Sequence, residues 1–100
     1  RYPYLPSHPS YDIARQQMSS GGAMVSFELA EGKNAAISMA ANLKLFVNAT
    51  SLGGVESLVE HRASVEKPNA ISPDNLLRLS IGLENPADLV DDLCRAIASL

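Results

Sequence analysis

The sequence is short of several residue types that carry structure or chemistry in other proteins. It has a single cysteine, Cys94, so no disulfide can form within the chain, and it has no tryptophan. No apolar run reaches membrane-spanning length, and no signal-peptide pattern is present. These absences favour a cytoplasmic protein. With no histidine nearby, Cys94 is expected to be a small buried residue on a helix.

Basic residues are also scarce and scattered. Eight lysines and arginines stand against eleven acidic residues, a net charge of -3. This balance argues against a nucleic-acid or anionic membrane partner, because both need a basic surface. The two histidines, His8 and His61, are far apart and no cysteine lies at ligand spacing, so no metal site is expected. The 46% hydrophobic content suffices for one small folded domain.

The pattern of apolar residues predicts alternating helices and strands. Residues 1–9 contain three prolines and are predicted to be a linker or lead-in, and residues 10–100 to form a single domain. The segment 57–62 fits either a helical turn or a short strand, and 63–75 is interpreted as a loop. The predicted elements are a helix from Pro9 to a stop at Gly21, strands at 24–29, 45–49 and 75–82, a helix at 34–43, and a final helix after Asn85.

This order predicts an α+β fold, with a small, mostly antiparallel sheet covered by helices on one face. On the helix 34–43, the apolar side is assigned to Ile37, Ala40 and Ala41. The final helix is expected to bury Leu89, Leu93, Ala96, Ile97 and Leu100. Its acids are assigned to a solvated face, and they follow Glu84 as Asp88, Asp91 and Asp92.

Two stretches carry the candidate site. Ser51 is followed closely by Gly53 and Gly54, which permit a tight turn at the end of a strand. Arg78 stands within an apolar strand, where a guanidinium needs a partner. Because the arginine fork matches a carboxylate bidentately, Ser51 and Arg78 predict a carboxylate site. The alternative is that Arg78 pairs with one of the chain's own eleven acids.

Four segments in this order resemble the carboxyl-terminal part of the Cys/Met-metabolism family of pyridoxal-phosphate enzymes, which includes cystathionine γ-synthase, cystathionine lyases and methionine γ-lyase. The segments are 5–9 (LPSHP) with 17–18 (QM), 22–29 (GAMVSFEL), 51–58 (SLGGVESL) and 77–84 (LRLSIGLE). The resemblance implies the small carboxyl-terminal domain of a fold-type I enzyme.

The resemblance also implies a function. The whole enzyme would perform elimination or replacement at the β or γ carbon of a sulfur-containing or O-acylated amino acid. Arg78 and Ser51 would bind the substrate α-carboxylate, with Thr50 and Leu52 as neighbouring specificity positions. Pyridoxal phosphate would be held mostly outside this chain, which would contribute no catalytic residue and be inactive alone. The implied partners are the amino-acid substrate, the remainder of the parent enzyme and further copies in a homotetramer.

The chain departs from the family pattern at two places. Thr50 stands where γ-synthases and γ-lyases often have glutamate, so a distal ammonium of the substrate would lose its counter-charge. His61 is followed by RASVEK rather than the common PASMTH, which changes a wall of the substrate pocket. The lysines are expected to be solvated and none resembles a Schiff-base lysine; they are Lys33, Lys44 and Lys67.

Two other readings remain open. The chain could be a free-standing α+β ligand-binding or dimerisation module in which Ser51 and Arg78 bind a small anion. It could also be a regulatory amino-acid-binding domain, which would bind its ligand in isolation.

Overall fold

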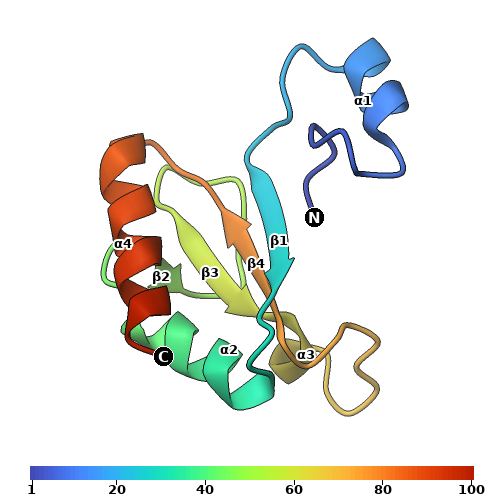
Figure 1. The fold of residues 1–100 in the computed structure, drawn as a ribbon. Helices are drawn as coiled ribbons and strands as arrows, with labels where there is room; N and C mark the ends of the chain where they lie inside the picture. The colour runs from blue at the N-terminus through green and yellow to red at the C-terminus, as the bar shows by residue number, and fades with distance from the viewer.

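The computed structural model describes residues 1–100 as an α+β fold, which confirms the predicted class (Figure 1). None of its helices has the length and apolar character needed to cross a membrane. The elements, in chain order, are α1 (Tyr11–Gln17), β1 (Met24–Glu28), α2 (Lys33–Asn42), β2 (Val47–Asn48), β3 (Leu58–His61), α3 (Arg62–Val65), β4 (Leu76–Ser80) and α4 (Pro86–Ala98).

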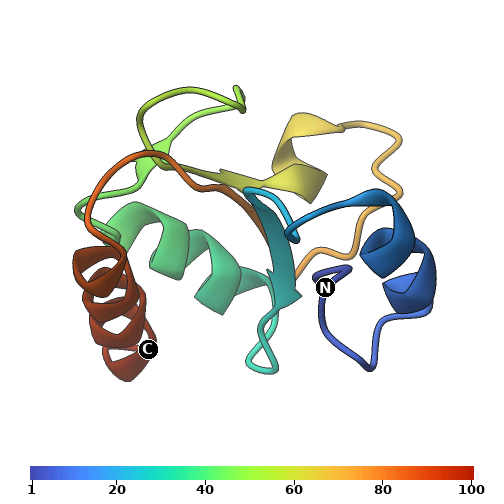
Figure 2. The same ribbon diagram turned by 90° about the horizontal axis from the view of Figure 1, so that it is seen from above.

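The four strands form one sheet in the order β1-β4-β3-β2. β4 pairs antiparallel with β1 and with β3, whereas β2 pairs parallel with β3, so the sheet is mostly antiparallel as predicted. The longer helices α2 and α4 lie on the same side of the sheet, and α1 lies apart, beyond β1 (Figure 2). β4, the last strand along the chain, is therefore central and is flanked on both sides by strands that precede it in sequence.

The core lies between the sheet and these two helices. Leu77 and Leu79 of β4 and Val59 of β3 are 0–3% exposed and face the helices. Alanines on α2 let its backbone approach the strands closely. The helix buries Ala36, Met39 and Ala40, so the predicted side was partly wrong: Ile37 is 42% exposed and Ala41 is also exposed.

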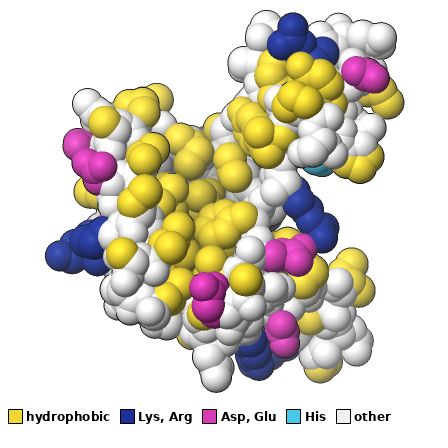
Figure 3. Space-filling view, viewed as in Figure 1, with side chains coloured by type: hydrophobic (Ala, Val, Ile, Leu, Met, Phe, Trp, Pro, Cys, Tyr) yellow, Lys and Arg dark blue, Asp and Glu magenta, His cyan; other side chains and the backbone are white.

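The final helix begins as its sequence predicts. The Asn85 side chain accepts a hydrogen bond from the Ala87 amide at 2.9 Å, and Pro86 occupies the first helical turn. Its buried face is narrower than expected, because Ile97 is 50% and Leu100 43% exposed. Beyond its edge, over the sheet between α4 and β1, hydrophobic side chains gather at the surface (Figure 3).

Two further predictions about this helix were wrong. Asp92 was assigned to the solvated face but is 5% exposed. It accepts hydrogen bonds from the amides of Lys44 and Leu45 at 2.8–3.0 Å and from Arg95 at 2.8 Å. Burial by itself would raise the pKa of Asp92, but these hydrogen bonds outweigh it and hold the pKa below the usual value. Cys94 is exposed, not buried.

The sequence left open whether residues 57–62 form a helical turn or a short strand, and the structure shows a strand. Residues 58–61 form the strand β3, and the predicted loop at 63–75 begins with the short helix α3. β2 is shorter than the predicted strand at 45–49. Residues 1–9 contain neither helix nor strand, and the Tyr4 hydroxyl donates to the Met18 carbonyl at 2.5 Å, which ties this segment to the end of α1.

Candidate functional site

Arg78 sits at the middle of β4, on the opposite face of the sheet from the helix-covered core. The register places Glu60 of β3 on one side of it and Ser26 of β1 on the other. Its sequence neighbours Leu77 and Leu79 point into the core, 0% and 3% exposed. The orientation of Arg78 follows from this alternation, because successive side chains of a strand point to opposite faces.

The Arg78 guanidinium meets one acid of the chain. Its Nη2 lies 2.5 Å from Glu60 Oε2, and it also donates to the Thr50 carbonyl at 3.4 Å. The Glu60 side chain is 3% exposed and that of Arg78 is 20% exposed. The pairing with an internal acid is thus present. Both contacts involve Nη2, while neither Nε nor Nη1 donates a hydrogen bond within the protein, and neither atom is fully buried.

The glycine turn after Thr50 is fixed along the end of β4. The Gly53 amide donates to Ser80 Oγ at 2.9 Å, and the Gly82 amide donates to Ser57 Oγ at 2.8 Å. The Leu83 amide donates to the Val55 carbonyl at 2.9 Å. Together with the Arg78–Thr50 contact, these three hydrogen bonds join the loop 50–57 to β4 and the residues that follow it.

Glu84 closes the far end of this loop. Its carboxylate accepts the Ser57 amide at 2.9 Å and the Ser57 hydroxyl at 2.8 Å. The amide hydrogen bond from Ser57 is the main reason that the pKa of Glu84 is lowered. Gly82 must lack a side chain here, since a Cβ would lie 2.3 Å from the Val55 carbonyl oxygen.

The predicted site residues are only partly brought together. The Thr50 backbone meets Arg78, but no hydrogen bond joins Ser51 to Arg78, and Ser51 is exposed. Leu52 is 55% exposed and projects from the same loop. Ser51 and Leu52 are thus free to face a ligand, while the loop that bears them is held in place.

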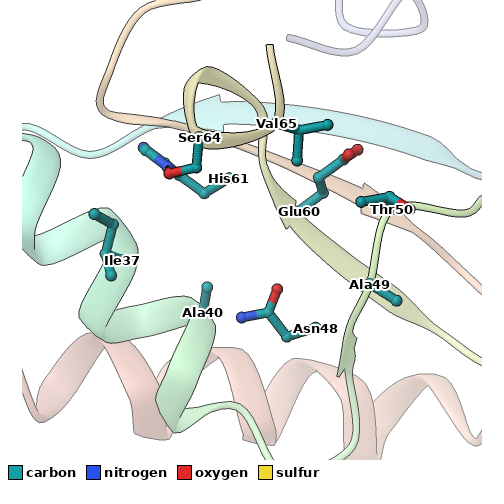
Figure 4. A pocket seen from close by; sticks show the side chains of 9 residues that line it. All are labelled: Ile37, Ala40, Asn48, Ala49, Thr50, Glu60, His61, Ser64 and Val65. Atoms are coloured by element: carbon teal, nitrogen blue, oxygen red, sulfur yellow. Dashed lines mark hydrogen bonds between the residues drawn. The ribbon is translucent and has the colours of Figure 1, made fainter. Parts of the chain in front are cut away.

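A cavity of about 210 Å³ opens beside this loop, where β2 ends and leaves the edge of β3 uncovered. Figure 4 shows the amide of Asn48, Thr50 and the Glu60 carboxylate at its border, with α2 opposite. The lining residues are Ile37, Ala40, Asn48, Ala49, Thr50, Glu60, His61, Ser64 and Val65. The His61 ring is held by the Ser64 hydroxyl at 2.5 Å and donates from Nε2 to the Asp74 carbonyl at 2.6 Å.

The charged groups on the far side of Glu60 from Arg78 were not predicted from the sequence. Arg62 Nη1 donates to Glu60 Oε1 at 3.0 Å, and Arg62 Nε donates to Glu66 at 3.2 Å. The hydrogen bond to Glu60 is the main cause that raises the pKa of Arg62. Glu60 could have been found if residues 57–62 had been assigned as a strand, because it would then lie next to an antiparallel neighbour.

Glu66 ends this series of charges. It accepts hydrogen bonds from the Ser72 amide at 3.0 Å, the Ser72 hydroxyl at 2.8 Å and the Ile71 amide at 3.1 Å. Led by the Ser72 amide, these donors lower its pKa to about 2.

Comparison with known proteins identifies the family. The family described as Cys/Met metabolism PLP-dependent enzyme matches residues 1–98. The cystathionine gamma-synthase of Mycobacterium tuberculosis strain H37Rv is 45% identical over 101 residues, covering 96% of this chain and 26% of that protein. The L-methionine gamma-lyase of Fusobacterium nucleatum subsp. nucleatum is 46% identical over 100 residues, covering 92% and 25%.

Solved structures agree with the sequence comparison. MetB from Corynebacterium glutamicum matches with a TM-score of 0.89 and 40% identity, over 98% of this chain and 27% of that one. CalE6, a methionine gamma lyase from Micromonospora echinospora, matches with a TM-score of 0.86 and 43% identity, over 97% and 26%. The chain spans about a quarter of the length of these relatives. It belongs to the Cys/Met-metabolism family of pyridoxal-phosphate-dependent enzymes.

Proposed function

We propose that residues 10–100 are the substrate-anchoring domain of a pyridoxal-phosphate-dependent trans-sulfuration enzyme, with residues 1–9 as its lead-in. The whole enzyme eliminates or replaces a group at the β or γ carbon of a sulfur-containing or O-acylated amino acid. In this domain Arg78 binds the substrate α-carboxylate, and Ser51 adds a hydroxyl donor. Thr50 and Leu52 contact the remainder of the substrate and influence its selection.

The free nitrogens of Arg78 are the observation that carries this proposal. A guanidinium saturated by internal acids would have no donors left for a ligand. Here both internal contacts use Nη2, so Nε and Nη1 remain available to a carboxylate. Holding the carboxylate fixes the orientation of the bonds at the substrate Cα, and this orientation is the domain's contribution to the rate.

The residues present in this chain do not fit a site for the cofactor itself. A lysine that bonds to pyridoxal phosphate lies in a pocket beside a phosphate cradle. All three lysines of this chain are exposed, and none forms a hydrogen bond or ion pair with Arg78 or the loop 50–57. Pyridoxal phosphate is therefore assigned to other parts of the whole enzyme, and the isolated chain should show no internal-aldimine absorbance band when pyridoxal phosphate is added.

The test uses the whole enzyme and compares two arginine-to-lysine variants. Arg78→Lys keeps the charge but loses the planar fork, so KM for the amino-acid substrate should rise about tenfold or more. Arg95→Lys on α4 makes the same chemical change at an ion pair with Asp92, away from the loop. KM of this control should change less than about twofold.

A substrate analogue sharpens the test. Replacing the α-carboxylate by a carboxamide should weaken binding to the wild-type enzyme and make no difference to Arg78→Ala. If the Arg78→Ala enzyme still prefers the carboxylate as strongly as the wild type does, Arg78 is not the anchor.

Membership of an enzyme family supports this reading over a module with no enzymatic parent. The regulatory-domain alternative predicts that the isolated chain binds an amino acid, which calorimetry can measure. We also propose that the whole enzyme assembles as a homotetramer in the cytoplasm. Its mass in solution, by light scattering, tests the assembly.

A further inference from the structure

Arg78 is the first of four charged side chains that contact one another in series and alternate in sign. Arg78 contacts Glu60, Glu60 contacts Arg62, and Arg62 contacts Glu66 at distances between 2.5 and 3.1 Å. Exposure of the side chains is 20% for Arg78, 3% for Glu60, 26% for Arg62 and 18% for Glu66. The positive end of this series lies at the proposed carboxylate anchor, and the negative end lies in the loop after α3.

The two arginines hold Glu60 differently. Arg62 Nη1 makes an aligned hydrogen bond to Glu60 Oε1 at 3.0 Å. Arg78 lies close to Oε2, but this oxygen is the single buried side-chain polar atom without an aligned hydrogen bond. Arg62 therefore binds Glu60 through a hydrogen bond as well as by charge. Arg78 interacts with Glu60 by charge alone.

This difference matters because a buried carboxylate needs a counter-charge. If Arg78 were the sole partner of Glu60, the carboxylate would draw the guanidinium onto itself and cancel its charge. An incoming substrate carboxylate would then compete with Glu60 for the same cation. With Arg62 also bound, Glu60 is neutralised from the other side and Arg78 keeps positive charge toward the open side of the site.

We propose that Glu60 and Arg62 are positioning residues for the α-carboxylate anchor: Glu60 holds the Nη2 edge of Arg78 in place, and Arg62 neutralises Glu60 so that Arg78 remains attractive to a carboxylate. Neither residue touches the substrate. This inference rests on the proposed role of Arg78.

The two substitutions should then act in opposite directions on substrate binding. In Arg62→Gln, Glu60 loses its second counter-charge, competes harder for Arg78, and weakens binding of an amino acid about fivefold. In Glu60→Gln, no negative charge opposes Arg78, so binding of the amino acid becomes tighter. Because the guanidinium is also held less firmly, kcat falls severalfold. The double variant should return to near wild-type affinity, because neither unbalanced charge remains.

The experiment measures equilibrium binding to the whole enzyme by calorimetry. The probe is L-norleucine, an amino acid without a leaving group, compared with its carboxamide. Arg62→Lys keeps the charge and should bind within about twofold of wild type. Arg1→Gln removes the arginine of an exposed ion pair with Glu28 and serves as the matched control, with no change expected. Circular dichroism and melting temperature establish that each variant is folded.

The outcomes separate this inference from the proposed function. If Arg78→Ala weakens norleucine binding but Arg62→Gln does not, the anchor stands and the positioning role is overturned. If the double variant Glu60→Gln/Arg62→Gln binds worse than either single one, the pair is structural only, and the inference is again overturned. If Arg78→Ala itself leaves binding unchanged, the proposed function fails, and this inference fails with it.

Discussion

Glu60 lies directly across the antiparallel ladder from Arg78, and its buried carboxylate is shared between Arg78 and Arg62. The strand pairing fixes the first contact, whereas the second comes from the start of α3, just after β3 ends. The proposed anchor is thus set by the sheet on one side and by a short helix on the other. Its supporting loop is fixed separately, by groups at the end of β4.

The close approach of Gly82 to that loop gives the first prediction. In Gly82→Ala the new Cβ would lie 2.3 Å from the Val55 carbonyl oxygen and 2.7 Å from the Ser57 amide nitrogen. The loop must shift, with a cost of about 1–3 kcal/mol in unfolding free energy and a raised KM. Gly54→Ala is the control, because its Cβ would meet nothing nearer than 4.0 Å. Equal KM values for the two variants would contradict the prediction.

Ser80 gives a second prediction for the same loop. Ser80→Ala removes the acceptor of the Gly53 amide, so amide hydrogen exchange at Gly53 should become faster. The loss of one hydrogen bond should cost about 1 kcal/mol. The Leu43 amide, bonded to the Met39 carbonyl at the end of α2, should exchange at an unchanged rate. Unaltered exchange at Gly53 would mean that this hydrogen bond does not hold the loop.

Asp92 gives a third prediction, about the packing of α4 against the segment after α2. In Asp92→Ala the amides of Lys44 and Leu45 lose their acceptor, and we expect a loss of about 2–4 kcal/mol in unfolding free energy. Asp91→Ala, an exposed neighbour on the same helix, should change it by less than about 0.5 kcal/mol. Urea unfolding of the two variants measures the difference. Similar midpoints would show that Asp92 does not join these segments.

Glu66 predicts a pH dependence of stability. Its pKa in the folded protein is about 2, below the ordinary value of 4.5, so the unfolded state binds the proton more readily. The stabilisation from Glu66 is therefore complete above pH 4.5 and declines as the pH falls toward 2. Glu66→Gln should unfold more easily than wild type at pH 7.

The check is the denaturant midpoint of both proteins as a function of pH. The gap between wild type and Glu66→Gln should be widest above pH 4.5 and narrow toward pH 2. Glu31→Gln, at an exposed glutamate, provides the control. A gap that stays constant down to pH 2 would show that ionisation of Glu66 does not stabilise the fold.

The sequence by itself determined the elements with strong local signals. The alternation of Leu77 and Leu79 with Arg78 defines β4 and the side on which the arginine stands. The Asn85 cap and Pro86 start α4, and two glycines allow the turn after Ser51. These features depend on neighbours within a few residues, so they can be predicted before any tertiary contact is known. The ordered set of segments also indicated the family.

The tertiary structure alone decided the long-range partners of the buried acids Glu60 and Asp92. Glu60 meets Arg78 only because β3 and β4 pair in one particular register. Asp92 is buried because residues 44 and 45 pass beside α4, where their backbone amides donate hydrogen bonds to its carboxylate. The same docking of α4 leaves Cys94 and Ile97 exposed. Helical periodicity predicts which side of a helix is apolar. How much of that side becomes buried depends on the surface that packs against it. Such long-range pairings are not encoded in the local pattern, and one of them, between Glu60 and Arg78, holds the proposed anchor.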